Sequence, residues 1–406
     1  MAKTSGFFFI MNGKTSNFVF RMKSLYLFNP ENDMALASGS PYYMSPASAK
    51  KMSADLSALP AWYAGIDGAV LLADETQVQW MQKECRLPLN VEWVAEGRFA
   101  NYTNFFPWGW SPVLSKRLLD NGAEYGLLPS EKQMSALREL SSRKTAVNLL
   151  PLLKQEDAVG ESFWLTSVEE VVNLSAKHDK VLLKSPWSGS GKGIQPLQGV
   201  PDDNLSGWIR RIISTQGGVV CEPYYNKVLD FAMEFYVADG SIGYVGYSLF
   251  ETDSRGIYKG NCLASNEAIE KRLSVYVNPE ILGRTRNKLM HELLELADGV
   301  YQGYLGVDMM VVQKADGYAL HPCVEVNWRM NMGVVSRLFF DRYMSPVSGG
   351  SYVIEYYPNK GDALNFHEEM KQKHPLLLQE GRLVEGYLSL TPVFFDTAYQ
   401  IYVKAK

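Results

Sequence analysis

Little in this 406-residue sequence marks a secreted, membrane-spanning or nucleic-acid-binding protein. Its four cysteines include no CxxC pair, so we interpret them as buried free thiols of a reducing compartment and predict a cytoplasmic location. No apolar run reaches the roughly 18 residues that span a bilayer, which argues against a membrane protein. There is no basic block and the net charge is −4, so we do not expect nucleic acid as a main partner.

The first residues also lack a recognisable secretory signal. Their apolar run, Gly6 to Met11, is too short for the apolar core of such a signal, and no small-x-small cleavage site follows it. We expect the folded part to begin at Met22 or just after. Residues 1–23 are predicted to be a disordered extension, or to stem from a wrongly chosen upstream start codon.

What the chain does have is enough length and apolar content for two or three packed units. A strand pattern at 24–28 is followed by a polar loop and a helix-like run, and a second strand is expected at 68–74. Strands that alternate with helices predict a small α/β domain over 24–130. The aromatic, proline-rich stretch 104–112 (NFFPWGWSP) is expected to be a rigid packed connector or a pocket wall.

The loop after the first predicted strand is a candidate substrate site. Domains of this class bind ligands in loops beyond the carboxyl ends of their strands. The loop reads NPEND, and it offers Asn29, Asn32 and Asp33 for such a role. The alternative interpretation is that these residues form turns and cap the following helix.

Helical spacing is clearest in two later segments. Residues 131–153 repeat apolar side chains at helical intervals, and Pro151 is expected to break or kink this segment. A second apolar helix face is predicted to run from Leu289 to Tyr304.

Strand patterns fill much of the rest of the chain. Strands are predicted at 181–184, 219–222, 230–238, 305–312 and 318–327. Two hairpin turns are indicated, one at Asp239-Gly240 and one at Asp316-Gly317. The tail after 336 is mixed and ends in two strand-like runs.

A glycine-rich segment, 181-VLLKSPWSGSGKGIQPL-197, has the composition of a phosphate-binding loop. It is not a Walker A loop, because the pattern fails both before Gly191 and after Lys192. It does not open a helix as a dinucleotide fingerprint does, because Pro196 forbids a regular helix there. We predict a flap between two strands whose backbone N–H groups close on phosphate oxygens, with Lys184 adding a fixed charge. The alternative is a plain surface turn.

A second polar cluster lies on the last predicted hairpin. Glu325 and Asn327 share one face of their strand, since side chains alternate along a strand, and Asp308 lies on the partner strand. Two carboxylates and an amide oxygen are ligands that suit Mg²⁺, with nucleotide phosphates completing its coordination. Arg329 has the same parity, and it either balances the carboxylates or faces a developing phosphate charge.

The order of these features resembles the ATP-grasp superfamily over about residues 135–345. The matching residues in chain order are Lys144, Lys184 with its glycine-rich flap, Glu222, Asp230, Asp308 and the E-x-N triplet at 325–327. The resemblance implies an α/β protein in which an α+β ATP-grasp fold follows a small Rossmann-like α/β domain. The expected divisions are an extension at 1–23, an N-terminal α/β domain at 24–130, a lid with the flap at 131–220, a core with the metal site at 221–345, and a C-terminal segment packed on the core at 346–406.

The resemblance also implies how ATP and metal are held. The cofactor-binding residues would be Lys144, Leu182, Lys184, Ser188, Gly189, Ser190, Gly191, Lys192, Gly193, Glu222, Pro223, Tyr225, Asp230 and Val324. In this scheme Lys144 (or its neighbour Arg143) and Lys184 contact the α- and β-phosphates, and the flap closes over the β- and γ-phosphates. The backbone after Glu222 reads adenine. The metal ligands would be Asp308, Glu325 and Asn327, binding one or two Mg²⁺, or Mn²⁺, and the catalytic residues would be Arg329 and Lys184.

The function implied by the resemblance is that of an ATP-dependent carboxylate–amine ligase that forms ADP and phosphate. Its partners would be small-molecule carboxylates and amines, most of all amino-acid or peptide-like ones, and analogy with the family suggests a homodimer. Arg255 and Lys259 would suit an anionic substrate, although the alternative is a solvated loop. His321 is expected to be a packed histidine. The alternative functions are a phosphotransferase and a non-catalytic nucleotide-binding or regulatory protein.

Overall fold

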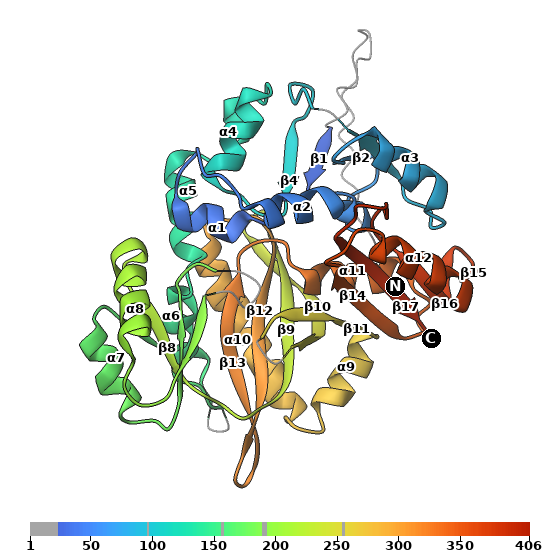
Figure 1. The fold of residues 1–406 in the computed structure, drawn as a ribbon. Coiled ribbons are helices and arrows are strands. Elements are labelled where there is room, and N and C mark those ends of the chain that lie inside the picture. The colour runs from blue at the N-terminus through green and yellow to red at the C-terminus, as the bar shows by residue number, and fades with distance from the viewer. Residues whose placement is uncertain (1–22, 96, 156–157, 189–192, 254–255) are drawn as a thin grey trace, which may run out of the picture.

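The computed structural model describes residues 23–95, 97–155, 158–188, 193–253 and 256–406, and the strands among them form three sheets (Figure 1). The first sheet is parallel, and the other two are antiparallel. This combination confirms the predicted fold class. The predicted extension, residues 1–23, lies outside the described residues apart from Lys23.

The parallel sheet has the strand order β3-β2-β1-β4. Its strands are β1 (Ser24–Leu27), β2 (Gly68–Leu71), β3 (Val91–Val94) and β4 (Asn104–Pro107). The helices of this region are α1 (Asn32–Ser38), α2 (Ala47–Asp55), α3 (Glu75–Glu84) and α4 (Pro112–Asp120), with 3₁₀ turns η1 (Leu59–Trp62) and η2 (Tyr125–Leu127). The two predicted strands are confirmed.

The expectation of a connector over 104–112 is wrong for its first four residues, which form β4. This strand pairs with β1 along its whole length. The side chain of Phe105 is buried and packs this strand against the core of the N-terminal region. The edge position in the sheet tolerates Pro107, because an edge strand has a side without ladder hydrogen bonds.

The smaller antiparallel sheet has the order β5-β8-β6-β7. Its strands are β5 (Phe163–Leu165), β6 (Val181–Lys184), β7 (Ile194–Leu197) and β8 (Val219–Pro223). Helices α7 (Val168–Ser175) and α8 (Asp203–Gln216) share a hydrophobic cluster with it. The glycine-rich segment joins β6 to β7, so the predicted placement of the flap between two strands is confirmed.

The large sheet has nine antiparallel strands in the order β13-β12-β9-β10-β11-β14-β17-β16-β15. They are β9 (Lys227–Ala238), β10 (Ser241–Thr252), β11 (Tyr258–Leu263), β12 (Gly303–Lys314), β13 (Gly317–Asn327), β14 (Gly350–Tyr356), β15 (Leu377–Gln379), β16 (Arg382–Ser389) and β17 (Tyr399–Ala405). Helices α9 (Asn266–Leu273), α10 (Pro279–Ala297), α11 (Met332–Tyr343) and α12 (Asp362–Lys373) accompany it. Both predicted hairpins are confirmed.

The helical segment at 131–153 is broken, but not by its proline. It forms α5 (Glu131–Leu140) and α6 (Lys144–Leu153), and Pro151 lies inside the last turn of α6. The break comes earlier, where the Thr145 hydroxyl donates to the Leu140 carbonyl at 2.7 Å and satisfies the end of α5. The predicted position of the break is therefore wrong.

The second predicted helix face is too long. Helix α10 ends at Ala297, and Tyr304 belongs to strand β12. Gly299, two residues after the helix, adopts a positive φ of 64°, a conformation that ends helices and suits glycine.

Two hydrophobic cores hold the layers together. One packs α6 and α10 on β9, β10, β12 and β13. The other joins α11 and the C-terminal strands to η1 and the parallel sheet, and here the buried Trp62 donates its indole N–H to the Leu390 carbonyl at 2.7 Å. In Figure 1, α1 and α2 lie between the parallel strands and the long strands of the large sheet.

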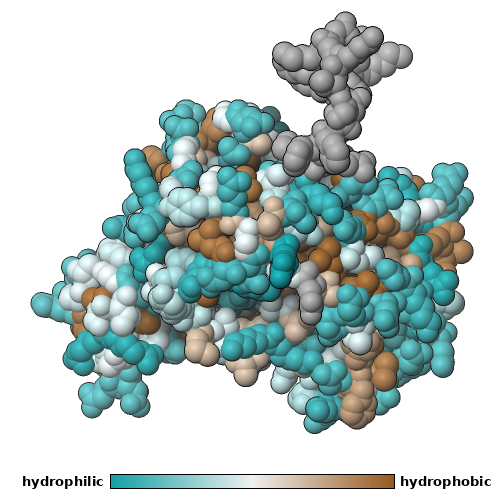
Figure 2. Space-filling model, turned by 90° about the horizontal axis from the view of Figure 1, so that it is seen from above, coloured by the Kyte–Doolittle hydropathy of each residue, from teal (hydrophilic) through white to brown (hydrophobic). Residues whose placement is uncertain are grey.

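The surface and the cysteines can be compared with the expectations from the sequence. On the face seen in Figure 2, apolar side chains are scattered among polar ones. No helix in the described part of the chain is both long and apolar enough to cross a bilayer. All four cysteines are free, as predicted, but only Cys221 and Cys323 are fully buried.

A buried carboxyl group lies where α11 meets the large sheet. Glu234, on β9, accepts hydrogen bonds from the Ser248 hydroxyl at 2.8 Å and from the Asn331 amide at 3.0 Å. Burial raises its pKa to about 7, partly offset by these two bonds. Gly306 and Gly333 leave room for it, since a Cβ on either would lie within 2.4 Å of a carboxylate oxygen.

We predict that Gly306→Ala destabilises the fold, because its methyl group would lie 2.4 Å from Glu234 and 2.6 Å from Asn331. The expected loss in the free energy of unfolding is about 1–3 kcal/mol, as for other overpacked sites. Gly243→Ala is the matched control, since its nearest neighbour would be a backbone oxygen at 4.0 Å. Urea unfolding checks both variants, and equal effects would contradict the steric account.

Candidate active site

The β12–β13 hairpin brings two carboxylates and an amide together. Antiparallel pairing places Asp308 directly opposite Glu325, and Asn327 opposite Gly306. The Asn327 amide nitrogen donates to the Asp308 carboxylate at 3.2 Å. The juxtaposition predicted from strand parity is confirmed, while the metal-binding role stays a prediction.

The electrostatics of this face suit a bound cation. The pKa of Asp308 lies well above its usual range, because burial removes the carboxyl group from water and the carboxylates of Glu325 and Glu234 lie nearby. No group of three or more His, Cys, Asp or Glu side chains among the described residues could hold a metal. Asn327 and ligand oxygens would have to complete the shell, which Mg²⁺ accepts. The residues present therefore fit the predicted ion.

Arg143 connects this face to the flap. Its side chain is only 4% exposed and donates to Glu325 at 2.9 Å. It also donates to the Ser185 carbonyl at 2.7 Å and to the Ser188 hydroxyl at 2.6 Å. Lys144, the residue preferred from the family resemblance, is exposed and lies over the Trp164 ring at 5.1 Å. Of the two neighbours, Arg143 is therefore the one that contacts both Glu325 and the flap, while the phosphate contact of Lys144 stays a prediction.

Lys184 is paired with Glu222 in the small sheet. Their side chains are 6% and 5% exposed, and the ammonium nitrogen lies 2.5 Å from a carboxylate oxygen. The other oxygen of Glu222 accepts a hydrogen bond from the Ser162 hydroxyl at 3.0 Å. The phosphate contact of Lys184 stays a prediction. The structure shows that the buried Glu222 carboxylate is its ion-pair partner, which the sequence did not reveal.

The described ends of the flap are tightly held. Gly193 has a φ of 76°, and a Cβ there would lie 2.1 Å from the Ser185 hydroxyl. The Ser185 N–H donates to the Gly193 carbonyl at 2.9 Å. Glycine at this position is thus required by both conformation and space. The predicted phosphate-binding residues Gly189, Ser190, Gly191 and Lys192 lie outside the described residues.

Two of the predicted cofactor-binding residues are apolar. Leu182, on β6, and Val324, on β13, are half-buried, and neither belongs to a core cluster of the described residues. Pro223 ends β8, and Tyr225 follows it with its ring 5.5 Å from the His321 ring. Purine stacking between apolar side chains is compatible with this arrangement.

His321 is a packed histidine, as expected. It is completely buried, and neither ring nitrogen has a hydrogen-bond partner among the described residues. Burial lowers its pKa to about 4, so the ring is neutral at pH 7. Asp230, which the family resemblance places among the cofactor-binding residues, accepts hydrogen bonds from Lys227 and, at 3.1 Å, from Thr252.

Arg329 is held by the N-terminal region. Its guanidinium makes two hydrogen bonds of 2.8 Å to the two oxygens of Asp33, which lies on α1. The next residue, Met330, donates its N–H to the Trp108 carbonyl at 2.9 Å. The role of Arg329 toward phosphate stays a prediction. The structure shows that Asp33 positions the guanidinium, a contact that the sequence did not reveal.

The predicted substrate residues are only partly available to a ligand. Asn29 donates to the Gly109 carbonyl at 2.8 Å, and Asn32, in the orientation that satisfies its amide, donates to Gly109 and Trp110 carbonyls. These two amides brace a loop instead of capping a helix. Lys259 is exposed on β11, and Arg255 lies outside the described residues.

The buried ion pair gives a stability prediction. Lys184→Met should lower the free energy of unfolding by about 3–5 kcal/mol, because it leaves the Glu222 carboxylate buried without its partner. The double variant Lys184→Met/Glu222→Gln should recover most of that loss. Urea unfolding of both single variants and the double variant measures the coupling. Additive effects would contradict a direct interaction.

Comparisons with known proteins show similarity at the level of the fold. No model of a known protein family matches the chain, and no curated protein has a matching sequence. Among solved structures, biotin carboxylase of Campylobacter jejuni aligns over 95% of this chain and 88% of its own, with 13% identity and a TM-score of 0.52.

Two further structures align with lower scores. N5-carboxyaminoimidazole synthetase of Staphylococcus aureus, complexed with ADP, has 12% identity and a TM-score of 0.46, covering 95% of this chain and 94% of its own. L-amino acid ligase of Bacillus licheniformis has 12% identity and a TM-score of 0.45, covering 95% and 93%. The sheet topology and the likeness to biotin carboxylase along nearly the whole chain show that this protein has the ATP-grasp fold.

Proposed function

We propose that the protein is an ATP- and Mg²⁺-dependent ligase that activates a carboxylate as an acyl phosphate and joins it to an amine. The observation that carries the proposal is the link made by Arg143, which joins the glycine-rich flap to the Asp308–Glu325 pair. A loop suited to phosphates thus lies against oxygen ligands suited to Mg²⁺. The ATP-grasp fold supports the same reading.

Each part of the site has a place in phosphoryl transfer. Such transfer needs positioning and charge neutralisation more than covalent help from the protein. Asp308, Glu325 and Asn327 would hold Mg²⁺, which when bound would neutralise charge on the transferred phosphate. Arg143 would then face the phosphates from below the flap, and Arg329 would add a second fixed positive charge held by Asp33.

The remaining steps follow from the chemistry of an acyl phosphate. A carboxylate oxygen of the first substrate attacks the γ-phosphorus, and ADP leaves with the electrons of the broken P–O bond. The amine then attacks the acyl carbon, phosphate leaves, and the ammonium intermediate gives up a proton. Closing the flap over the phosphates would keep water away from the reactive acyl phosphate.

The substrates of this reaction are proposed at the level of class. Small-molecule carboxylates and amines, with amino acids and short peptides first, are the acceptors to test. We further propose a cytoplasmic location, which the free cysteines support. Analogy with the ATP-grasp family supports a homodimer.

The test is ADP release from Mg²⁺-ATP with pools of amino acids and dipeptides. Asp308→Asn should lower turnover about a hundredfold or more, since one ligand of the charge-neutralising ion changes. Asp316→Asn is the matched control, because this carboxylate lies on the turn of the same hairpin with 78% of its side chain exposed. Thermal unfolding confirms that both variants fold.

The products distinguish the alternatives. A condensed product supports the ligase, whereas a substrate that gains only a phosphoryl group identifies a phosphotransferase. Nucleotide binding without ADP release in any pool indicates a non-catalytic nucleotide-binding protein. Wild-type turnover by Asp308→Asn would remove the metal assignment.

A further inference from the structure

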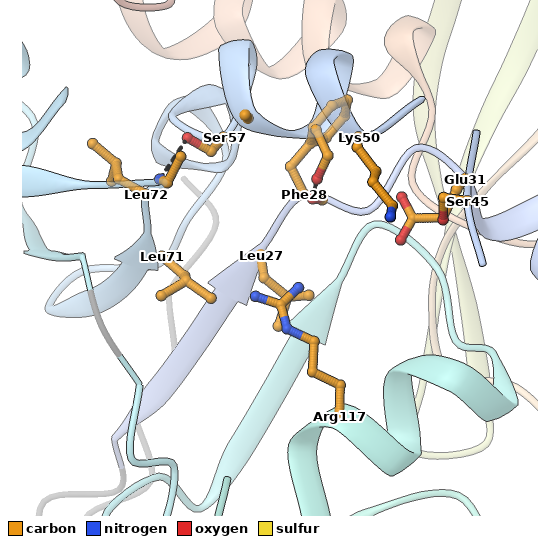
Figure 3. Close-up of a pocket in the computed structure, with 12 residues that line it drawn as sticks. Leu27, Phe28, Glu31, Ser45, Lys50, Ser57, Leu71, Leu72 and Arg117 are labelled. Atoms are coloured by element: carbon orange, nitrogen blue, oxygen red, sulfur yellow. Dashed lines mark hydrogen bonds between the residues drawn. The ribbon is translucent and has the colours of Figure 1, made fainter. Parts of the chain in front are cut away.

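The parallel sheet carries a cavity of its own. It has a volume of about 310 Å³ and lies at the carboxyl ends of β1 and β2, between α2 and α4 (Figure 3). Leu27 and Leu71, the last residues of the two strands, form part of its floor. The size lies at the lower end of the range for small-molecule sites, roughly 300–1,000 Å³. None of the residues assigned to the nucleotide or the metal lines it.

The cavity is lined by charges of both signs that form no ion pair among the described residues, although burial raises the pKa of Glu31 and the nearby charge of Arg117 lowers it. Glu31 has one carboxylate oxygen that is buried and has no hydrogen-bond partner. Among the described residues, the end groups of Lys50 and Arg117 make no hydrogen bond or ion pair. In Figure 3, Lys50 and Glu31 point toward each other, and Arg117 reaches from α4 toward the end of β1.

Other polar groups of the lining are already used by the protein. The Ser53 hydroxyl donates to the Phe28 carbonyl at 3.1 Å, and the Ser57 hydroxyl donates to Gln77 at 2.5 Å. The polar chemistry left for a ligand is therefore dominated by one carboxylate and two cations. A buried carboxylate oxygen without a partner is costly, so a donor that reaches it would be favoured.

We propose that this cavity binds a small zwitterion, an α-amino acid or short peptide, with its carboxylate at Lys50 and Arg117 and its ammonium group at Glu31. A simple anion would meet the Glu31 carboxylate, and a simple cation would meet the two positive side chains. A zwitterion satisfies both ends, and charge-assisted hydrogen bonds supply the recognition. As the substrate site of a ligase, the assignment rests on the proposed function; as a binding site, it stands on the cavity alone.

Glu31 in the cavity and Asp33, the partner of Arg329, lie two residues apart in the sequence. Glu31 directly precedes α1, and Asp33 on that helix holds the Arg329 guanidinium through two hydrogen bonds. A ligand that contacts Glu31 therefore lies next to the segment that fixes the arginine of the proposed transfer site.

The experiment is calorimetric titration of the full chain with L-alanine and L-alanyl-L-alanine. N-acetyl-L-alanine, which keeps only the anion, and L-alanine amide, which keeps only the ammonium, serve as half-ligands. Both zwitterions are compared with both half-ligands, and we expect at least one zwitterion to bind about tenfold or more tightly than either half-ligand. Arg117→Met and Glu31→Gln should each weaken that zwitterion by about tenfold or more.

The controls separate the cavity from the fold. Lys116→Met removes a charge from the neighbouring residue of α4, which pairs with Asp120 at 2.9 Å and does not line the cavity, so it should bind as the wild type does. Lys50→Gln changes an exposed side chain and keeps the test available if Glu31→Gln fails to fold. Thermal unfolding with Mg²⁺ and a non-hydrolysable ATP analogue checks the nucleotide site in every variant.

The outcomes separate this proposal from the ligase assignment. Zwitterion binding that the cavity variants weaken, without ADP release in any pool, supports the cavity and overturns the ligase. Nucleotide binding and turnover without zwitterion binding overturn the cavity and leave the ligase. Half-ligands that bind as tightly as the zwitterions, or binding that the variants leave unchanged, also overturn the cavity assignment.

Discussion

Asp308 and Glu325 stand opposite each other because the β12–β13 register places them there, and the burial of Asp308 beside a second carboxylate is the constraint on which the rest of the site depends. Two carboxylates at close quarters cannot both stay ionised without a compensating charge. Arg143 supplies part of that compensation through Glu325, and it does so from a position that also holds the flap. A divalent cation would supply the rest.

The other charges follow the same logic. Each of three site cations is paired with a carboxylate: Arg143 with Glu325, Lys184 with Glu222, and Arg329 with Asp33. A buried charge without a partner costs several kcal/mol, so these pairs allow the site to exist without its ligands. On binding, metal would take the place of a positive side chain beside a carboxylate, and phosphate would take the place of a carboxylate beside a positive side chain. If Glu325 held Mg²⁺, the Arg143 guanidinium would be free to face phosphate, so the two ligands should favour each other's binding.

The sequence predicts which side chains share a face of a strand, but not which residues that are distant in the chain contact each other. Strand parity predicted the face shared by Asp308 and Glu325, because alternation is fixed by the backbone. The sequence could not show which of Arg143 and Lys144 contacts the flap, since that depends on where α6 begins. The partner of Lys184 was out of reach, because nothing local reveals that β6 lies beside β8. Strand β4 was missed because its pairing with β1 is tertiary.

The segment from the end of β1 into the first turn of α1 shows how neighbouring residues can contact different parts of the structure. Glu31 lines the cavity, Asn32 binds the Gly109 loop, and Asp33 holds Arg329. Asn29 ties the same loop to Gly109 from its other end. Both amides therefore brace the segment that carries Glu31 and Asp33, which links the cavity to the ion pair of Arg329. If the cavity binds the substrate as proposed, this braced segment would set the distance between the substrate and the charge that would steady the transferred phosphate.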